Sequence, residues 1–217
     1  MPLVLASASP SRLRLLRLAG IEPEVRVSHV DEEAIAAAAS PSEPEAYVQL
    51  LATAKARAVA DAITAEAAAN ARPGVAHSAP LVLGCDSAFE LDGVVYGKPH
   101  HPQVALERWR AMRGRVGLLH SGHWLIDHRG STDNGGLGAV TTASVTFADV
   151  SDDELEAYVA TGEPLEVAGG FKIDARGGAF IERVDGDPHA VVGLSVSTVR
   201  ALASEFGVAW PEFWNRG

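Results

Sequence analysis

The sequence predicts an α/β fold built on a mixed sheet. Segments with helical periodicity alternate with short apolar runs along the chain, which is the pattern of a sheet covered by helices. Asp92 and Gly93 stand between two apolar arms, where a hairpin turn requires such residues. Hairpin arms are antiparallel, so a purely parallel doubly wound sheet is not favoured. With 217 residues, 47% of them hydrophobic, we expect one domain over residues 1–217.

The first strand and the first helix are the most clearly marked elements. Residues 3–6 form an apolar run bounded by serines, and leucines at helical spacing follow. Ser9 fits the N-cap, and Pro10 fits the first helical position because an N–H there would have no partner. Gly20 fits the C-terminal stop. We therefore predict strand, turn and helix.

The remaining elements follow from the same two periodicities. Further strands are predicted at residues 24–28, 81–84, 122–127, 139–147 and 179–184. Further helices are predicted from the capping-box pair Ser42 and Glu45 into the alanine-rich stretch, over 103–112, from the capping-box pair Ser151 and Glu154 to about 160, and over 196–206 before Gly207. Residues 129–138 form a polar, glycine-rich connector, and residues 185–188 form a turn.

Composition excludes several classes of function. The formal net charge is -10 and no cluster of Lys and Arg occurs, so we expect no stable nucleic-acid complex. No run of about 18 apolar residues and no export signal is present, so we expect neither a membrane span nor secretion. The single cysteine, Cys85, cannot form an internal disulfide, which suits a cytoplasmic location.

The turn between the first strand and helix has the outline of an anion site. Ser7, Ser9 and free backbone N–H groups lie at a helix N-terminus, and Arg12 stands one turn into the helix. The alternative is an ordinary Ser-Pro cap with a surface arginine, and this segment alone does not decide between them. Neither a Walker loop nor a GxGxxG sequence occurs.

Asp86 is the most suggestive single carboxylate. It ends an apolar strand, and such a residue is often presented beside the sheet, where it can hold a metal or accept a proton. The alternative is a turn-forming aspartate. Lys55 and Lys98 are uninformative individually, because most lysines are solvated. The pairs His100–His101 and His120–His123 lack an acidic partner at metal-ligand spacing, so a histidine metal site is not favoured.

Taken together, several segments resemble the Maf family of nucleoside triphosphate pyrophosphatases, the septum formation inhibitor Maf-like proteins. The opening family pattern LASxSPRRxxLL is matched by Leu5, Ala6, Ser7, Ser9, Pro10, Arg12, Leu15 and Leu16. Ser11 stands where the family usually has a first arginine. Further matches in the family's order are Glu32, Lys55, Asp86 with Ser87, GKP at 97–99, GR at 114–115, GEP at 162–164, AGG at 168–170 and VVGLS at 191–195.

The resemblance implies a specific fold and activity. The fold would be a mixed α/β structure of two lobes flanking a central cleft, related to the inosine triphosphate pyrophosphatases. The activity would be hydrolysis of nucleoside triphosphates to monophosphate and pyrophosphate, dependent on Mg²⁺ or Mn²⁺ and often carried out by a homodimer. Asp86 matches the family's proton acceptor. Ser7, Arg12, Glu32, Lys55 and Lys98 match positions that line the cleft. Arg12, Lys55, Lys98 and the helix start at Ser9 would stabilise the phosphates, and Glu32 and Asp86 would hold the metal.

The segment around residue 170 leaves the preferred base open. The family branch acting on thymidine and uridine triphosphates has DKAGxYGIQG, whereas this chain has Val167, Phe171 and Asp174 at the lysine, tyrosine and glutamine positions. Phe171 and Lys172 are closer to the branch acting on 7-methyl-GTP, although Asp174 replaces its usual glutamate. Lys172 and Asp174 are therefore expected to contact the substrate.

Two other functions fit the same motifs. A nucleotide-binding regulator of septum formation and division arrest would need no turnover, but the presence of Asp86 with Lys55 and Lys98 favours an enzyme. A nucleotidyl or phosphoryl transferase would use a different acceptor, and only its products would distinguish it from a hydrolase.

Overall fold

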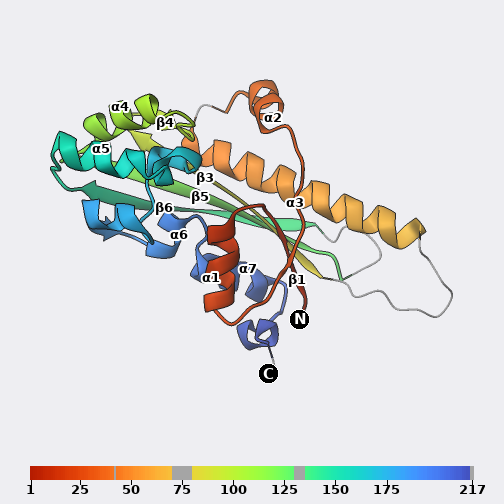
Figure 1. Cartoon of the computed structure of the whole chain (residues 1–217). Helices are drawn as coiled ribbons and strands as arrows, with labels where there is room; N and C mark the ends of the chain where they lie inside the picture. Colours follow the sequence, from red (N-terminus) through yellow and green to blue (C-terminus); the bar gives the residue numbers. More distant parts are fainter. Residues whose placement is uncertain (42, 70–79, 130–134, 216–217) are drawn as a thin grey trace. The chain divides into compact units, whose positions relative to one another are not determined.

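The computed structural model describes residues 1–41, 43–69, 80–129 and 135–215. In these residues one mixed sheet of seven strands has the order β2-β1-β3-β5-β6-β7, and β4 pairs with β3 (Figure 1). The strands are β1 (Leu3–Ala6), β2 (Glu24–Val25), β3 (Leu81–Leu91), β4 (Val94–Tyr96), β5 (Val116–Asp127), β6 (Gly136–Phe147) and β7 (Ile181–Asp185). β1 pairs in parallel with β2 and β3, whereas β3 with β4 and β6 with β7 pair antiparallel. This arrangement confirms the mixed α/β prediction.

Helices and short 3₁₀ segments connect the strands. The helices are α1 (Pro10–Leu18), α2 (Glu32–Ala39), α3 (Pro44–Ala69), α4 (Pro102–Met112), α5 (Asp152–Ala160), α6 (Pro188–Val192) and α7 (Val196–Glu205). The 3₁₀ segments are η1 (Glu163–Glu166), η2 (Ala168–Gly170), η3 (Arg176–Phe180) and η4 (Trp210–Phe213). No helix in the described ranges is both long enough and apolar enough to cross a bilayer.

The chain divides into two compact units. Unit 1 comprises Met1–Asp86, Gly122–Val140 and Gly193–Gly217, and unit 2 comprises Ser87–Ser121 and Thr141–Val192. Strands β3, β5 and β6 contribute residues to both units. The division matters for the site residues, because those of the first 86 residues belong to unit 1 and those of residues 98–174 belong to unit 2.

In unit 1, α3 packs very closely on the sheet. Its apolar face shares a buried cluster with β1, β3 and β5, which includes Ala56, Val59 and Val82. A Cβ on Gly84 of β3 would lie 2.1 Å from the carbonyl oxygen of Ala52, so only glycine permits this approach. The long orange helix in Figure 1 is α3. This packing brings a buried stretch of α3 against the end of the unit 1 part of β3.

Unit 2 is built around aromatic side chains. Phe147 makes edge-to-face contacts with Phe89, Trp109 and Phe171 at centroid distances of 5.7, 5.5 and 5.0 Å. Such pairs add to the stabilisation that burial of the rings provides. The Trp109 indole N–H donates to the carbonyl of Gly170 at 2.8 Å, which satisfies the one polar atom of this ring. The segment that follows Gly170 therefore begins from a rigid core.

Several local predictions are confirmed in detail. Ser9 caps α1 with Pro10 in the first turn, and Gly20 has φ +82°. Ser151 and Glu154 make both bonds of the predicted capping box. Asp92 and Gly93 both have positive φ, as a two-residue hairpin turn requires. The proposed cap at Ser42 lies outside the described residues, as do residues 130–134 of the 129–138 connector, and β6 already begins at Gly136.

Other boundaries differ from the predictions. β3 and β5 are much longer than the predicted 81–84 and 122–127, because their continuations mix small, polar and apolar residues. β2 stops at Val25, short of residue 28. α2 was not predicted at all. It is capped by Asp31, but none of its residues is buried, so it has no apolar stripe for periodicity to detect. α6 was not predicted either; it begins at Pro188, the last residue of the predicted 185–188 turn.

Candidate active site

A buried ion-pair group lies where α3 meets β3 in unit 1. The Nζ atom of Lys55 lies 2.6 Å from Oδ1 of Asp86 and 2.9 Å from Oε1 of Glu32. Lys55 and Asp86 are 7% and 8% exposed, whereas Glu32 at the start of α2 is exposed. One ammonium therefore separates two carboxylates, one inside the fold and one at its surface.

Burial controls the acid-base behaviour of Asp86. Loss of solvation raises the pKa of Asp86 above its ordinary value, and the positive charges of Lys55 and Arg12 oppose this rise. A carboxylate with a raised pKa is a stronger base than a solvated one, and the cations that face Asp86 favour its ionised form. Asp86 is thus suited to accept a proton. The alternative of a turn-forming aspartate does not explain its ion pair with Lys55.

Arg12 is a buried residue that joins three parts of unit 1. Its Nε donates to the carbonyl of Gly193 at 2.8 Å, and its NH1 donates to the carbonyl of Cys85 at 2.8 Å and to Oγ of Ser7 at 3.1 Å. The surface-arginine alternative is therefore wrong. Because Cys85 immediately precedes Asp86, the guanidinium is held beside the carboxylate.

The N-terminus of α1 completes this group. The Ser9 hydroxyl accepts from the backbone N–H of Arg12 at 3.5 Å, and the Ser9 N–H donates to Oγ of Ser7 at 3.2 Å. The first-turn N–H groups of a helix carry partial positive charge and favour an anion. Ser7, Ser9 and Arg12 are thus brought together with Asp86, Lys55 and Glu32 in one unit, as a cationic and dipolar surface around one base.

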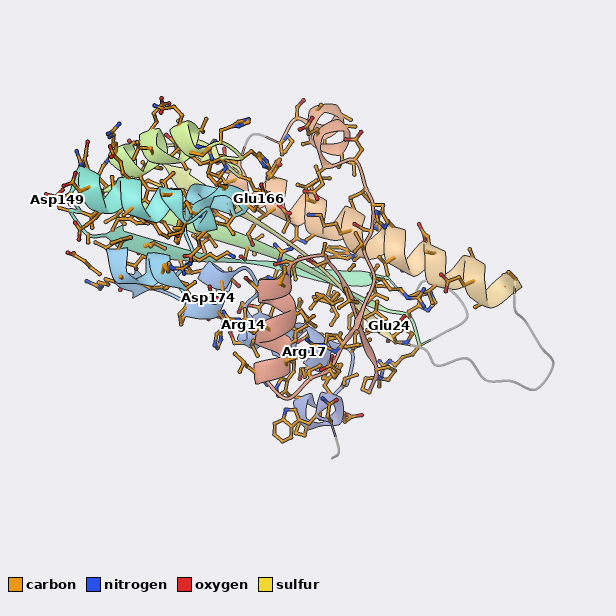
Figure 2. The ribbon with its side chains drawn as sticks, viewed as in Figure 1. Arg14, Arg17, Glu24, Asp149, Glu166 and Asp174 are labelled. Carbon is orange, nitrogen blue, oxygen red and sulfur yellow. The ribbon has the colours of Figure 1, made fainter. Side chains whose placement is uncertain are left out.

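The three remaining predicted site residues belong to unit 2. Lys98 is exposed and follows β4, and the N–H of His100, two residues later, donates to the carbonyl of Leu165 in η1 at 2.9 Å. Lys172 and Asp174 are both partly buried, and they lie between η2 and η3; Asp174 is labelled in Figure 2. Lys98 thus precedes η1 in the chain, and Lys172 and Asp174 follow it.

Sequence reasoning missed the two backbone carbonyls that bind Arg12 and the histidine that binds the start of α7. The carbonyls of Cys85 and Gly193 bear no side-chain signal, so no pattern could assign them to Arg12. His123 was considered only as a metal ligand, but its Nε2 accepts the backbone N–H of Ser195 at 2.8 Å. Ser195 caps α7 and follows Gly193 closely. A buried histidine on a strand was the only available signal. His120 contacts Glu90 and Thr142 at 3.0 and 2.9 Å.

The carboxylates fit a divalent metal only in part. Among the residues that the structure describes, no three His, Cys, Asp or Glu side chains gather as a complete ligand set. Glu32 and Asp86 nevertheless face the same cation at hydrogen-bond distance. Magnesium is commonly held by one or two carboxylates together with water and substrate phosphates, so two converging carboxylates are an adequate protein contribution.

Comparison with known proteins identifies the family of this chain. Residues 2–206 match the family model described as Maf-like protein. The chain is 56% identical over 220 residues to the nucleoside triphosphate pyrophosphatase of Leifsonia xyli subsp. xyli, covering 100% of this chain and 98% of that protein. It is 48% identical over 215 residues to the protein of the same name from Salinispora tropica, covering 99% of this chain and 88% of that one.

A third relative and one solved structure were also found. The nucleoside triphosphate pyrophosphatase of Synechocystis sp. is 46% identical over 211 residues, covering 97% of each chain. The structure of the Staphylococcus aureus Ham1 protein gives a TM-score of 0.40 at 15% identity, covering 69% of this chain and 73% of that chain. Because one family model spans nearly the whole sequence and the relatives align from end to end, this chain belongs to the Maf-like protein family.

Proposed function

We propose that this protein hydrolyses nucleoside triphosphates to a nucleoside monophosphate and pyrophosphate, as a housekeeping enzyme of the nucleotide pool. The observation that supports this most directly is the buried Asp86, with Lys55 at 2.6 Å and Arg12 held on the neighbouring carbonyl of Cys85. Family membership supports the same reaction, because the relatives compared above are named nucleoside triphosphate pyrophosphatases.

Asp86 acts as the proton acceptor in this proposal. Its carboxylate takes a proton from water while the water oxygen forms a bond to the α phosphorus. The bond between that phosphorus and the α–β bridging oxygen breaks, and pyrophosphate leaves with the electron pair. General-base assistance of this kind contributes about a hundredfold or more to a rate. The raised pKa of Asp86 makes the proton transfer more favourable than it would be to a solvated carboxylate.

Positive groups stabilise the charge that develops on the phosphates. Arg12, Lys55 and the α1 N-terminus at Ser9, with Ser7 orienting Arg12, supply this stabilisation in unit 1. Lys98 of unit 2 is proposed as a further phosphate-binding residue. The whole chain, residues 1–217, is proposed to act as one catalytic domain, which the span of the family match supports.

We propose Glu32 and Asp86 as the ligands of a divalent cation, Mg²⁺ or Mn²⁺. The convergence of both carboxylates on Lys55 supports this assignment, because the same oxygen atoms can face a metal ion when Lys55 turns to a phosphate. When bound, such an ion neutralises phosphate charge and lowers the pKa of a coordinated water. Glu32 is suited to bind late, since it is exposed and belongs to a helix with no buried residue.

Lys172 and Asp174 of unit 2 are proposed to contact the nucleobase. Asp174 is only partly buried, so its carboxylate can accept hydrogen bonds from a base edge that carries N–H donors. Guanine, with its N1–H and amino group, suits a carboxylate acceptor. We therefore propose a guanine or modified-guanine triphosphate as the preferred substrate. A homodimer and a cytoplasmic location are proposed from family resemblance and from the single cysteine.

A regulator of division without turnover is not favoured, because Asp86, Lys55 and Arg12 lie together in unit 1, which supports the proposed base. The test is a screen of purified protein, with Mg²⁺ or Mn²⁺, against common and modified nucleoside triphosphates. Monophosphate and pyrophosphate in equal amounts support hydrolysis, whereas a modified acceptor would indicate a transferase. Asp86→Asn should lower turnover by about a hundredfold or more. Asp61→Asn, at an exposed position of α3, is the matched control. Near-normal turnover in a folded Asp86→Asn protein would show that Asp86 is not the base.

A further inference from the structure

The segment that contains Lys172 and Asp174 is closed by two side chains from outside it. We call residues 172–177 the 172–177 loop. The N–H of Gly177, the last of the loop, donates to Oε1 of Glu163 at 2.9 Å. The N–H of Arg176 donates to Oε2 of the same carboxylate at 3.3 Å. The backbone of Lys172, the first residue, and the Tyr158 hydroxyl both lie close to Gly177. Glu163 therefore holds the C-terminal end of the loop, and Tyr158 lies where the two ends meet.

Tyr158 and Glu163 also bind each other. The Tyr158 hydroxyl donates to Oε1 of Glu163 at 3.0 Å, the same carboxylate that accepts the N–H groups of Arg176 and Gly177. Burial raises the pKa of Tyr158, and the neighbouring Glu163 carboxylate raises it further. The phenol therefore remains a donor at neutral pH. Tyr158, Glu163 and the C-terminal end of the loop form one hydrogen-bonded group.

This pair is itself rigidly placed. The Tyr158 ring packs edge-to-face against Trp109 and Phe180, with centroids 5.3 and 5.4 Å away. The Glu163 side chain is only 9% exposed, and its residue opens η1 directly after Gly162, whose φ is +75°. A buried carboxylate is costly unless hydrogen bonds satisfy it, and here three donors do so. The buried Glu163 carboxylate therefore carries a desolvation free energy that a surface glutamate would not have.

The two ends of the loop lie very close to Tyr158 and to each other. A Cβ on Gly177 would lie 2.5 Å from the Tyr158 hydroxyl and 2.9 Å from the carbonyl of Lys172. The two ends of the loop therefore touch each other as well as Tyr158 and Glu163. Lys172 and Asp174 project from a closed ring of backbone whose ends are fixed, so their positions depend on the pair more than on solvent-exposed neighbours.

We propose that Tyr158 and Glu163 are positioning residues for base selection: they hold the 172–177 loop so that Lys172 and Asp174 present one fixed arrangement to the nucleobase. This inference rests on the proposed role of those two residues in base recognition. A held acceptor discriminates between bases more sharply than a mobile one, because a mobile carboxylate can turn away from a mismatched edge and be solvated.

The experiment compares Tyr158→Phe and Glu163→Gln with two matched controls. Tyr158→Phe removes only the hydroxyl and keeps the ring packing. Glu163→Gln keeps the shape but replaces one accepting oxygen by a donor that faces an N–H. The controls make the same chemical changes in unit 2 away from the loop: Tyr96→Phe on β4, and Glu166→Gln at the exposed end of η1, labelled in Figure 2.

Two measurements separate loop position from base recognition. Limited digestion with trypsin, which cleaves after Lys172 and Arg176, reports whether the loop is held. The ratio of kcat/KM for GTP to that for dTTP reports discrimination. We expect both test variants to be cleaved faster at these two sites and the ratio to fall at least about threefold, mainly through KM of the preferred substrate. The double variant should equal the larger single effect, since the pair acts as one unit. The controls should match the wild type.

Three results would overturn the inference in distinguishable ways. If the ratio is unchanged in Tyr158→Phe and Glu163→Gln but changes in Asp174→Gln, the pair does not position the loop for recognition, while the base role stands. If Asp174→Gln and Lys172→Met also leave the ratio unchanged, the proposed base role fails and the inference falls with it. If trypsin cleaves the test variants no faster than the controls, the pair does not hold the loop.

Discussion

The Lys55 ammonium lies 2.6 Å from Asp86 and 2.9 Å from Glu32, so a single cation joins a buried carboxylate to an exposed one. The buried partner is the candidate base, and the exposed partner belongs to α2, none of whose residues is buried. An ion pair formed inside the fold is weakened little by solvent, whereas the one to Glu32 is open to competition from substrate and metal. Lys55 is therefore held more firmly by Asp86 than by Glu32.

Replacement of Lys55 should move the pH dependence of the reaction. Burial raises the pKa of Asp86, and Lys55 is the largest opposing influence, so Lys55→Met should raise this pKa further. A base works only when ionised, so the acid limb of kcat/KM should shift to higher pH in Lys55→Met. Arg14→Met, at an exposed position of α1, should leave the limb in place. An unmoved limb in Lys55→Met would show that another group sets it.

The raised pKa of Asp86 also determines the sign of its contribution to the pH dependence of folding stability. A carboxyl whose folded pKa is above its unfolded value favours the folded state most below the unfolded pKa, and this contribution is lost as pH rises through the folded pKa. Asp86→Asn, which removes the buried charge, should therefore gain stability relative to wild type as pH rises from 4 to 7, on the order of the change in that single ionisation. Urea unfolding at several pH values measures it.

Gly84→Ala should destabilise unit 1 and displace Lys55. The added Cβ would lie 2.1 Å from the Ala52 carbonyl and 2.8 Å from the Ala56 N–H, both in the α3 backbone on either side of Lys55. Overpacking of this kind costs roughly 1 to 3 kcal/mol, and here backbone must move. Gly97→Ala is the control, because nothing lies within 4 Å of its Cβ position. Equal urea midpoints for the two variants would contradict the close packing of α3.

Arg12→Ala should lower both stability and substrate affinity. The change leaves the buried carbonyls of Cys85 and Gly193 without their donor, and it removes a cation beside Asp86. Loss of a charged hydrogen bond costs roughly 1.5 to 3 kcal/mol, so the melting temperature should fall and KM for the triphosphate should rise. Thermal unfolding and steady-state kinetics are the measurements, with Arg14→Ala as the control. A purely electrostatic role would leave the melting temperature unchanged.

Cys85 should be inert in the folded protein. Its side chain is fully buried, and burial raises the pKa of the thiol to about 11. The reactive thiolate is therefore scarce at pH 8, and reagent cannot reach it. Iodoacetamide should give no adduct by mass spectrometry under native conditions and a single adduct in denaturant, since the chain has one cysteine. Rapid alkylation under native conditions would show that the part of β3 around Cys85 unfolds locally and exposes the thiol.

Base preference should follow Asp174. We expect kcat/KM for GTP or a modified guanine triphosphate to exceed that for dTTP, and Asp174→Gln should narrow the difference, because an amide loses one acceptor. Asp149→Asn, at an exposed position of unit 2 labelled in Figure 2, is the control. Competition at equal substrate concentrations decides the ratio. A wild-type preference for dTTP would exclude Asp174 from base recognition but leave hydrolysis intact.

The sequence by itself determined the elements whose signals are local. The cap at Ser9, the capping box at Ser151 and the turn at Asp92 depend on residues within one turn of each other, so a short window contains their whole physical cause. Asp86 was also identified, because the apolar run before it is visible in sequence; the expectation that it ends the strand was wrong, since β3 continues to Leu91. α2 escaped detection for the converse reason: a helix that buries nothing has no apolar stripe.

Only the tertiary structure decided which of these residues work together. Lys55 faces Asp86 because glycine at position 84 lets α3 approach β3, and Arg12 is fixed by carbonyls of Cys85 and Gly193, which carry no side-chain pattern. Tyr158 binds Glu163, and Glu163 binds the end of the 172–177 loop directly. These contacts join residues far apart in the chain, and their energies depend on packing and burial that exist only after the chain has closed on itself.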